Sequence, residues 1–371
     1  MSDTVDMPEW RGGWLNRLVA RPGFQSWASK FPLTRPRVRA DGAALFDIVQ
    51  GFVQSQVLFA LVELQVFRRL RAGPLTAAEL GHAFDISGER VQIVLQAGAA
   101  LGLLKRKRNG RFALARKGAA LMGVPGLEAM ILHHRAFYDD MRDPVKLLRG
   151  PDETELSKFW PYVFGGDVPA AEANVYSDLM AQSQRLVAED TLHAVSLKGV
   201  SHLLDVGGGT GAFLEAVGKA APRMKMTLFD LPAVVPGAEQ RFAAAAMADR
   251  VAIVPGSFRD DNLPDGADAI SLIRVLYDHS DETVRALLTR VFAALPKGGR
   301  LIVSEPMGGG TRPDRAGDVY FAFYTMAMQT GRARSASEIS TLLAEVGFSD
   351  VTTLKAVRPY VTQVVTAVRS E

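Results

Sequence analysis

The sequence contains no cysteine among its 371 residues. This absence excludes disulfide bonds, thiolate nucleophiles, Cys-ligated zinc and iron–sulfur clusters. The histidines and carboxylates nowhere have the spacing of metal ligands, so we expect no metal site. A secretory signal is also missing, as is any apolar run near the roughly 20 residues that span a bilayer. We therefore expect a cytoplasmic protein without a transmembrane helix.

Excess charge is scarce as well, and it is unevenly distributed. Lys and Arg total 43 and Asp and Glu total 40, so the net charge is +3. Residues 1–40 have seven cations and three anions, which leaves −1 on the other 331 residues. A protein that coats nucleic acid is disfavoured, because this body has no excess positive charge to neutralise phosphates.

The arm formed by residues 1–40 also holds Trp10, Trp14 and Trp27, three of the four tryptophans. Basic residues are attracted to anionic headgroups, and Trp favours the membrane interface. The arm therefore fits peripheral contact with the inner or photosynthetic membrane, or contact with a partner subunit, and both stay open. Its prolines and glycines predict an irregular chain with one short helix at Trp14–Val19.

Residues 41–125 are expected to form a winged helix-turn-helix. Apolar residues at helical spacing predict a helix over 42–72. Thr76 and Ser87 can cap two shorter helices, and Asn109–Gly110 predicts a β-hairpin. The second short helix has one cation and is otherwise mostly apolar, which favours packing over reading DNA. A winged-helix transcription regulator is therefore the less favoured alternative.

Helices are predicted over 126–198, and strands alternate with helices over 199–371. This alternation predicts an α/β fold with a mostly parallel, Rossmann-like sheet. Only Arg358–Tyr360 separates the last two strands, so the final strand is expected to run antiparallel. The expected strands are His202–Val206, Lys225–Phe229, Val251–Val254, Ala269–Arg274, Arg300–Ser304, Val351–Val357 and Val361–Val368.

The string LLDVGGGTG follows the first of these strands and opens a helix. Gly207, Gly209 and Gly211 permit a tight turn and close approach to a ligand. Asp230 ends the second strand, where a carboxylate can bind both hydroxyls of a ribose. An NAD-dependent enzyme nearly fits this spacing and stays an alternative. Asp205, two residues before the loop, would oppose a pyrophosphate and suit a sulfonium, so S-adenosylmethionine (SAM) is the favoured ligand.

Six strings, in order, resemble the motifs of the SAM-dependent O-methyltransferases of the caffeate/hydroxyindole type. They are LLDVGGGTG, LFDLPAVV, VPGSFRDDNLP, IRVLYDHSDE, LPKGGRLIVSEP and LLAEVGFSDV. The resemblance extends over residues 42–371 and implies a homodimer formed through the N-terminal domain, with S-adenosylhomocysteine (SAH) as product. Within the family, the strings resemble a bacterial branch of carotenoid biosynthesis, which implies a lipophilic carotenoid hydroxyl as acceptor. Another small aromatic compound or a tetrapyrrole is the alternative acceptor.

The resemblance also implies which residues bind SAM. They are Ser183, Asp205, Gly207, Gly209, Gly211, Asp230, Leu231, Ser257, Phe258 and Arg274. Ser257 departs from the family, which usually has an acidic residue there to hold the adenine amine.

The catalytic position departs from the family as well. The family's general base is a His, and the aligned residue here is Tyr277, two residues before His279. One acid of the family aligns with Glu305 and is kept, whereas a second aligns with Ala333 and is lost. If residues 275–279 are extended, Tyr277 and His279 point to one face. His279 could then accept the substrate proton, or Tyr277 could orient the substrate.

Purely structural roles for these residues remain open. His279 could face solvent at the start of a helix that Ser280 caps, and Tyr277 could serve packing alone. His133 and His134 lie in the region that lines the family's acceptor pocket, so one of them could be the base, although a structural role is favoured. The pocket itself is expected from residues 126–180 and from the aromatic, Met-rich stretch 319–331, which could equally form a core or dimer helix.

Overall fold

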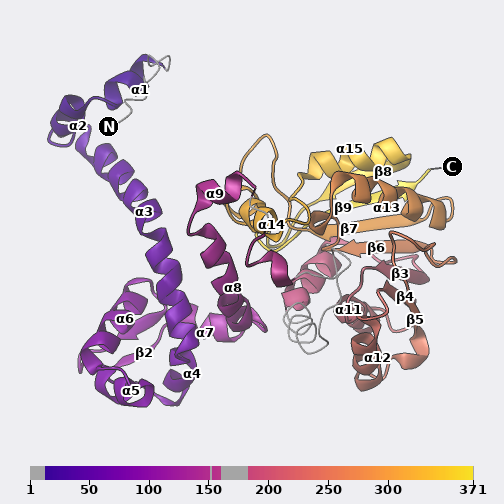
Figure 1. Cartoon of the computed structure of the whole chain (residues 1–371), viewed down its shortest axis with the longest axis horizontal. Coiled ribbons are helices and arrows are strands. Elements are labelled where there is room, and N and C mark those ends of the chain that lie inside the picture. Colours follow the sequence, from indigo (N-terminus) through magenta and orange to yellow (C-terminus); the bar gives the residue numbers. More distant parts are fainter. Residues whose placement is uncertain (1–12, 151–152, 160–182, 371) are drawn as a thin grey trace. The chain divides into compact units, whose positions relative to one another are not determined.

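The computed structural model describes residues 13–150, 153–159 and 183–370. Its contacts divide the chain into two compact units, Met1–Ala119 and Ala120–Glu371 (Figure 1). The finer division into an arm, two helical segments and a SAM-binding domain stays a prediction.

The arm is helical where the structure describes it. α1 spans Trp14–Val19 as predicted, but α2 (Pro22–Ala28) follows, and α3 (Arg35–Glu63) begins seven residues before its expected start. The prediction of an otherwise irregular arm is therefore wrong. Pro22 and Pro36 stand in the first turns of their helices, where a missing N–H breaks no intrahelical bond.

By length and composition, α3 is a candidate for a membrane-spanning helix, although the sequence predicts no transmembrane helix. The helix has 29 residues, and a window within it has a mean hydropathy of 1.5 and is 17% buried. The helix predicted over 42–72 covers most of α3, but isolated polar residues such as Asp47 and Gln50 keep each continuous apolar run short. Buried core helices and signal sequences meet the same criterion, so it does not establish a span. Large apolar side chains exposed on α3 are Leu45, Phe46, Ile48, Val49, Phe52 and Val53.

Two helices and a hairpin follow α3, as predicted. The predicted helix over 42–72 is broken at Gln65, whose φ of 54° lies in the left-handed region. Thr76 forms a capping box with Glu79, whereas Ser87 occupies the N-cap position without a side-chain bond. The elements are α4 (Val66–Arg69), η1 (Leu70–Ala72), α5 (Ala77–Phe84), α6 (Gly88–Ala100), β1 (Leu104–Arg106), β2 (Phe112–Leu114) and α7 (Arg116–Met122).

The second unit contains a seven-stranded sheet of order β5-β4-β3-β6-β7-β9-β8. Its strands are β3 (His202–Val206), β4 (Lys225–Asp230), β5 (Val251–Pro255), β6 (Ala269–Ile273), β7 (Arg300–Glu305), β8 (Phe348–Leu354) and β9 (Gln363–Arg369). β3 to β7 pair in parallel, and β9 runs antiparallel to both β7 and β8, which confirms the fold class and the antiparallel final strand. β8 begins three residues before its predicted start, because an irregularity between Ser349 and Thr352 hides the alternation.

Helices cover both faces of this sheet (Figure 1). On one face, Leu204 and Val206 of β3 pack with α13 and α15, while Leu203 faces the cluster that includes α11 and α12. This period of two directs successive side chains of a strand to opposite layers. The helical elements are α8 (Leu127–Met141), α9 (Pro144–Leu148), η2 (Ser157–Phe159), residues 183–194, α11 (Ala212–Ala220), α12 (Val235–Ala244), η4 (Ala248–Arg250), η5 (Leu276–Asp278), α13 (Asp281–Ala294), the π-helical η6 (Arg315–Phe321), α14 (Ala322–Met328) and α15 (Ala336–Val346).

The sheet order makes β3 the point where the connections change direction. From β3 the chain proceeds to β4 and β5 on one side, and β6 then returns to the other side of β3. Ligands of open α/β sheets bind at such a point, beyond the carboxyl ends of the strands. The loops after β3, β4 and β6 are therefore where a site is expected.

Candidate active site

The loop after β3 turns on three glycines in the left-handed region. Gly207, Gly209 and Gly211 have φ values of 69°, 59° and 78°. A Cβ at Gly207 would lie 2.9 Å from Val275, and one at Gly211 would lie 2.3 Å from the Phe242 ring, so both glycines fit the packing of the strand and helix. No described atom lies within 4 Å of a Cβ built at Gly209. Only the middle glycine of the three therefore faces open space.

Asp230, at the end of β4, closes this loop. Its carboxylate accepts hydrogen bonds from the Gly209 amide at 2.6 Å and from the Leu231 amide at 2.7 Å. Burial raises the pKa of Asp230, while these two amide bonds act to lower it. The side chain predicted to bind the ribose thus lies beside the glycine that faces open space.

Asp205 lies beneath the same loop and is 1% exposed. Its Oδ1 accepts a hydrogen bond of 2.6 Å from the Ser271 hydroxyl, but its Oδ2 has no partner among the described residues. Burial raises the pKa of Asp205 to about 7. A buried carboxylate with an unmet acceptor disfavours a phosphate ligand and fits one with a cationic group.

Arg274 joins two of the predicted residues. Its guanidinium donates to the Ser183 hydroxyl at 2.9 Å and to the Tyr277 hydroxyl at 3.1 Å. Arg274 directly follows β6 and has a φ of 59°, which is unusual for a side chain of this size. Such conformations persist where surrounding contacts fix them, often at functional sites.

Tyr277 is 2% exposed and lies in η5. Residues 275–279 are therefore not extended throughout, so the condition under which Tyr277 and His279 would point to one face is not met. Burial raises the pKa of the Tyr277 phenol well above its ordinary value. The phenol stays protonated, so it can donate a hydrogen bond to a substrate oxygen but does not act as a phenolate base.

His279 is buried rather than exposed to solvent, with 8% of its surface accessible. The Arg259 guanidinium contacts its Nδ1 at 3.1 Å, and the Phe258 ring packs edge-on at 5.2 Å between centroids. Arg can only donate, so Nδ1 accepts and the proton of the neutral ring is on Nε2. This arrangement leaves neutral His279 no lone pair for a substrate proton. Burial lowers its pKa to about 4.

Glu305 supports this segment through the backbone. Its Oε2 accepts from the amides of Leu276 at 2.9 Å and Tyr277 at 3.2 Å, and its Oε1 has no partner among the described residues. Burial raises the pKa of Glu305 to about 8. In the family that the sequence resembles, the acid at this position steadies the catalytic His. In this chain the same acid holds the turn that contains Tyr277.

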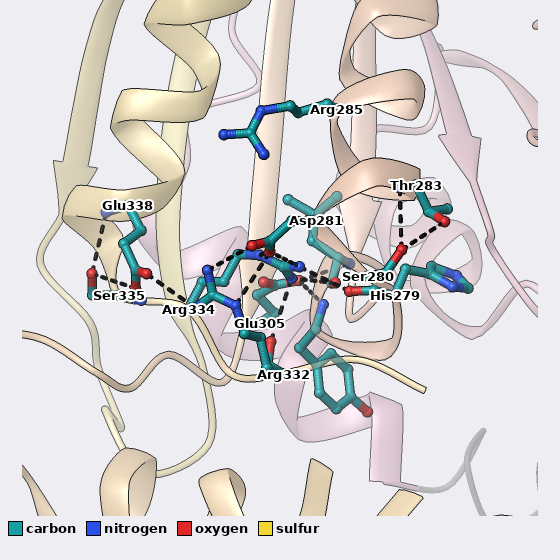
Figure 2. A network of polar contacts seen from close by, with 12 residues as sticks. His279, Ser280, Asp281, Thr283, Arg285, Glu305, Arg332, Arg334, Ser335 and Glu338 are labelled. Carbon is teal, nitrogen blue, oxygen red and sulfur yellow. Dashed lines mark hydrogen bonds and ion pairs between the residues drawn. The ribbon is translucent and has the colours of Figure 1, made fainter. Parts of the chain in front are cut away.

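Arg334 is the residue that the sequence did not reveal. It is fully buried and donates to the carbonyl oxygens of Leu276 at 2.7 Å and His279 at 2.8 Å. It also binds the Asp281 carboxylate at 2.6 Å, so it ties both ends of the segment 276–281 together (Figure 2). The only signal was its place next to Ala333, where the family's second acid is lost.

The remaining predicted residues lie around these loops. The Ser257 hydroxyl donates to Asp260 at 2.9 Å and its amide donates to Asp261 at 2.8 Å, so the acids near this loop come three and four residues after the family position. Leu231 is partly exposed beside Asp230. Residues 160–182 of the expected acceptor pocket lie outside the described residues. In the described part of the chain, no group of three or more His, Asp or Glu side chains could hold a metal ion.

Residues 138–349 match the model of the O-methyltransferase domain, and residues 46–123 match that of the O-methyltransferase dimerisation domain. The chain is 56% identical over 355 residues to the demethylspheroidene O-methyltransferase of Cereibacter sphaeroides, covering 95% of this chain and 94% of that protein. It is 50% identical over 361 residues to the protein of the same name from Rhodobacter capsulatus, covering 97% of this chain and 90% of that protein.

Solved structures show the same fold. Human N-acetylserotonin methyltransferase in complex with SAM matches with a TM-score of 0.76 and 24% identity, over 89% of this chain and 98% of that one. CalO1, a methyltransferase of calicheamicin biosynthesis in its SAH-bound form, matches with a TM-score of 0.74 and 26% identity, over 89% and 98% of the two chains. The family models and the sequence relatives indicate a methyltransferase, and not an NAD-dependent enzyme or a transcription regulator. The chain belongs to the O-methyltransferase family and is a SAM-dependent O-methyltransferase.

Proposed function

We propose that this enzyme methylates the hydroxyl of a lipophilic carotenoid intermediate of the demethylspheroidene or hydroxyneurosporene type, in carotenoid biosynthesis. The observation that supports this acceptor is the 56% identity to the C. sphaeroides demethylspheroidene O-methyltransferase over nearly the full length of both chains.

SAM supplies an activated methyl group on a sulfonium sulfur when it is bound. We assign its ribose to Asp230 and the open side of Gly209, and its cationic end to the unmet oxygen of Asp205. Leu231, Ser257 and Phe258 are assigned to the adenine side, and Ser183 and Arg274 to the side that faces Tyr277. Open space at Gly209 and the orphaned oxygen of Asp205 support this placement.

We assign the three predicted catalytic residues to positioning the acceptor. Orientation at a carbon that is already activated can supply several kcal/mol of the barrier reduction. Tyr277, fixed by Arg274, has a hydroxyl proton with which to orient the acceptor oxygen. Glu305 and His279 hold the segment on which Tyr277 lies.

We propose a cytoplasmic homodimer that forms through residues 46–123 and contacts the inner or photosynthetic membrane through its arm. The part of the arm over residues 13–40 has six cations and no acidic residue. Trp14 and Trp27 are 71% and 52% exposed. Each basic residue near an anionic surface contributes about 1 kcal/mol of attraction.

Vesicle sedimentation tests the membrane contact. Full-length protein is mixed with vesicles that contain phosphatidylglycerol and with vesicles of phosphatidylcholine alone. We expect salt-sensitive binding to the anionic vesicles, reduced by Trp14→Ser with Trp27→Ser. Unchanged binding in this variant, or equal binding to both vesicles, would contradict the proposal.

Methyl transfer from labelled SAM tests the acceptor. The panel contains carotenoid alcohols, small phenols and tetrapyrroles, presented in detergent micelles. We expect the highest kcat/KM for a carotenoid alcohol. Turnover of a phenol or tetrapyrrole with none of any carotenoid would overturn the proposed acceptor.

A further inference from the structure

Two histidines of α8 pair with two tyrosines from the segment η6–α14. The Nε2 of His134 lies 2.6 Å from the Tyr320 hydroxyl, and the Nε2 of His133 lies 3.1 Å from the Tyr324 hydroxyl. The two tyrosine rings are stacked, with their centroids 5.7 Å apart. Residues more than 180 positions apart in the sequence thus form two parallel polar pairs within an aromatic cluster.

The hydrogen bonds of His134 fix its protonation state. Its Nδ1 lies 2.5 Å from the carbonyl oxygen of Met130, one turn earlier in α8. A carbonyl can only accept, so Nδ1 has the proton and Nε2 has the lone pair. Nε2 must then accept from the Tyr320 hydroxyl. Burial lowers the pKa of His134, so the ring is neutral near neutral pH and its Nε2 lone pair is available.

Tyr320 also lies close to the segment already described. α14, which follows it directly, packs against η5, the turn that contains Tyr277. Burial raises the pKa of the Tyr320 phenol, the charge of Arg274 acts to lower it and Tyr277 acts to raise it. Tyr320 stands in the π-helical turn η6, a kind of local irregularity that is frequent at functional sites.

The two pairs differ in accessibility. Tyr324 is 5% exposed and belongs to the buried cluster with Phe137 and Met328. Tyr320 is only partly buried. Tyr320 therefore has more of its surface exposed than Tyr324, although both pairs join a histidine of α8 to a tyrosine.

We propose that Tyr320 and His134 form the relay that removes the proton of the acceptor hydroxyl. This inference rests on the proposed function, because an aliphatic alcohol is too weak an acid to ionise before methyl transfer. The acceptor oxygen bonds to the methyl carbon as the C–S bond breaks, and the bonding pair stays on sulfur. The hydroxyl proton moves to the Tyr320 oxygen, and the Tyr320 proton moves to Nε2 of His134.

Charge is conserved in this step. The positive charge that sulfur loses as SAH forms reappears on the His134 imidazolium. The imidazolium keeps its Nδ1–H bond to Met130, which favours the charged form. Tyr320 is the group that would touch the substrate, and His134 acts through it. Neither residue occupies the sequence position of the family's His, which here is Tyr277.

Two variants and their combination test the relay in the full-length enzyme. Tyr320→Phe removes the relaying hydroxyl, and His134→Gln keeps a hydrogen-bond acceptor without its basicity. We expect each to lower kcat by about 10- to 100-fold, with KM and the Kd for SAM changed by less than about twofold. Because the pair acts as a unit, the double variant should lose no more than the worse single variant.

Tyr324→Phe is the matched control, because it removes the hydroxyl of the parallel pair. It should leave kcat close to wild type. A kcat near wild type in both single variants, losses that multiply in the double variant, or an equal loss in Tyr324→Phe would overturn the relay. If Tyr320→Phe does not fold, the kcat of His134→Gln alone tests the relay. If the wild-type enzyme methylates only acceptors that are not carotenoids, the proposed acceptor is wrong but the relay is still testable. The same variants are then compared on the acceptor that the enzyme does methylate.

Discussion

The carboxylate of Asp230 accepts a hydrogen bond of 2.6 Å from the amide of Gly209. This contact places the acid that was predicted to bind the ribose against the glycine of its loop that faces open space. Gly209 lies in the loop that follows β3 and Asp230 ends the neighbouring strand β4, so the pairing of these two strands brings them together. The nucleoside site that we propose would therefore be a preformed turn beyond the ends of two parallel strands.

Asp230→Asn should weaken SAM binding. The amide keeps the size of the side chain but loses the charge that strengthens bonds to the ribose hydroxyls. We expect the Kd to rise about 10- to 100-fold, as charge-assisted bonds contribute about 1.5–3 kcal/mol. Isothermal calorimetry with SAM measures it. Asp268→Asn is the control. Asp268 binds Ser201 and His202 near the opposite end of β3, so this variant should leave the Kd for SAM unchanged.

Gly209→Ala and Gly211→Ala should separate ligand binding from folding. The Gly211 variant forces a Cβ against Phe242 and should lower the melting temperature markedly, at a cost of about 1–3 kcal/mol for overpacking. The Gly209 variant meets no described atom and should lose SAM affinity with a smaller change in melting temperature. Equal destabilisation by both variants, with equal SAM affinity, would contradict this division.

Tyr277→Phe and His279→Ala should both lower turnover while sparing SAM affinity. The first removes the hydroxyl that Arg274 fixes, and we expect kcat to fall about tenfold without loss of stability. The second leaves Arg259 and the Phe258 ring without their partner, so the melting temperature should fall as well. Normal kcat in both variants would remove this segment from catalysis.

Arg334→Met should destabilise the enzyme strongly. The substitution leaves the Leu276 and His279 carbonyls and the Asp281 carboxylate without their buried partner. A buried acceptor that loses its donor costs about 1–3 kcal/mol, and two carbonyls lose theirs here, whereas Asp281 is 44% exposed and keeps Arg332. Arg332→Met is the matched control, because Arg332 binds the same Asp281 but its side chain is 47% exposed. It should cost less than about 1 kcal/mol in denaturant titrations.

Stability should fall as the pH rises from about 4.5 to 8. The pKa of Glu305 is raised by burial from 4.5 to about 8, so the folded state keeps a proton that the unfolded state has released. The contribution is complete below the unfolded pKa and is lost as the pH rises through the folded one. The buried Asp205, with its pKa raised to about 7, acts in the same direction. Glu305→Gln should flatten this slope, as measured by urea unfolding at several pH values.

Much of the second unit could be predicted from the sequence, because local patterns dictate it. Strands such as His202–Val206 are buried, short and bounded by turn residues, and the glycines after them need conformations that other residues avoid. The Thr76 capping box and the antiparallel β9 are likewise local, since each follows from a few neighbouring residues.

Contacts between distant segments could not be predicted. Arg334 lies 55 residues from the His279 carbonyl that it binds, and no periodic pattern in the sequence predicts this contact. The alternative in which His279 faces solvent is wrong, because Arg259 and Phe258, from the loop after β5, pack against its ring. The pairing of His134 with Tyr320 spans 186 residues and is likewise invisible to local patterns.

The strand order also determines when the sheet can be completed as the chain is synthesised. Among the described strands, β8 pairs with β9 alone, and β9 pairs with both β7 and β8. The ribosome makes β8 first, but β8 cannot join the sheet until β9 has been made and inserted between it and β7. Open strand edges are templates for pairing with other chains. Until β9 has paired with β7, β7 therefore has an open edge and β8 has no partner among the described strands, so the sheet is complete only when this last strand is inserted.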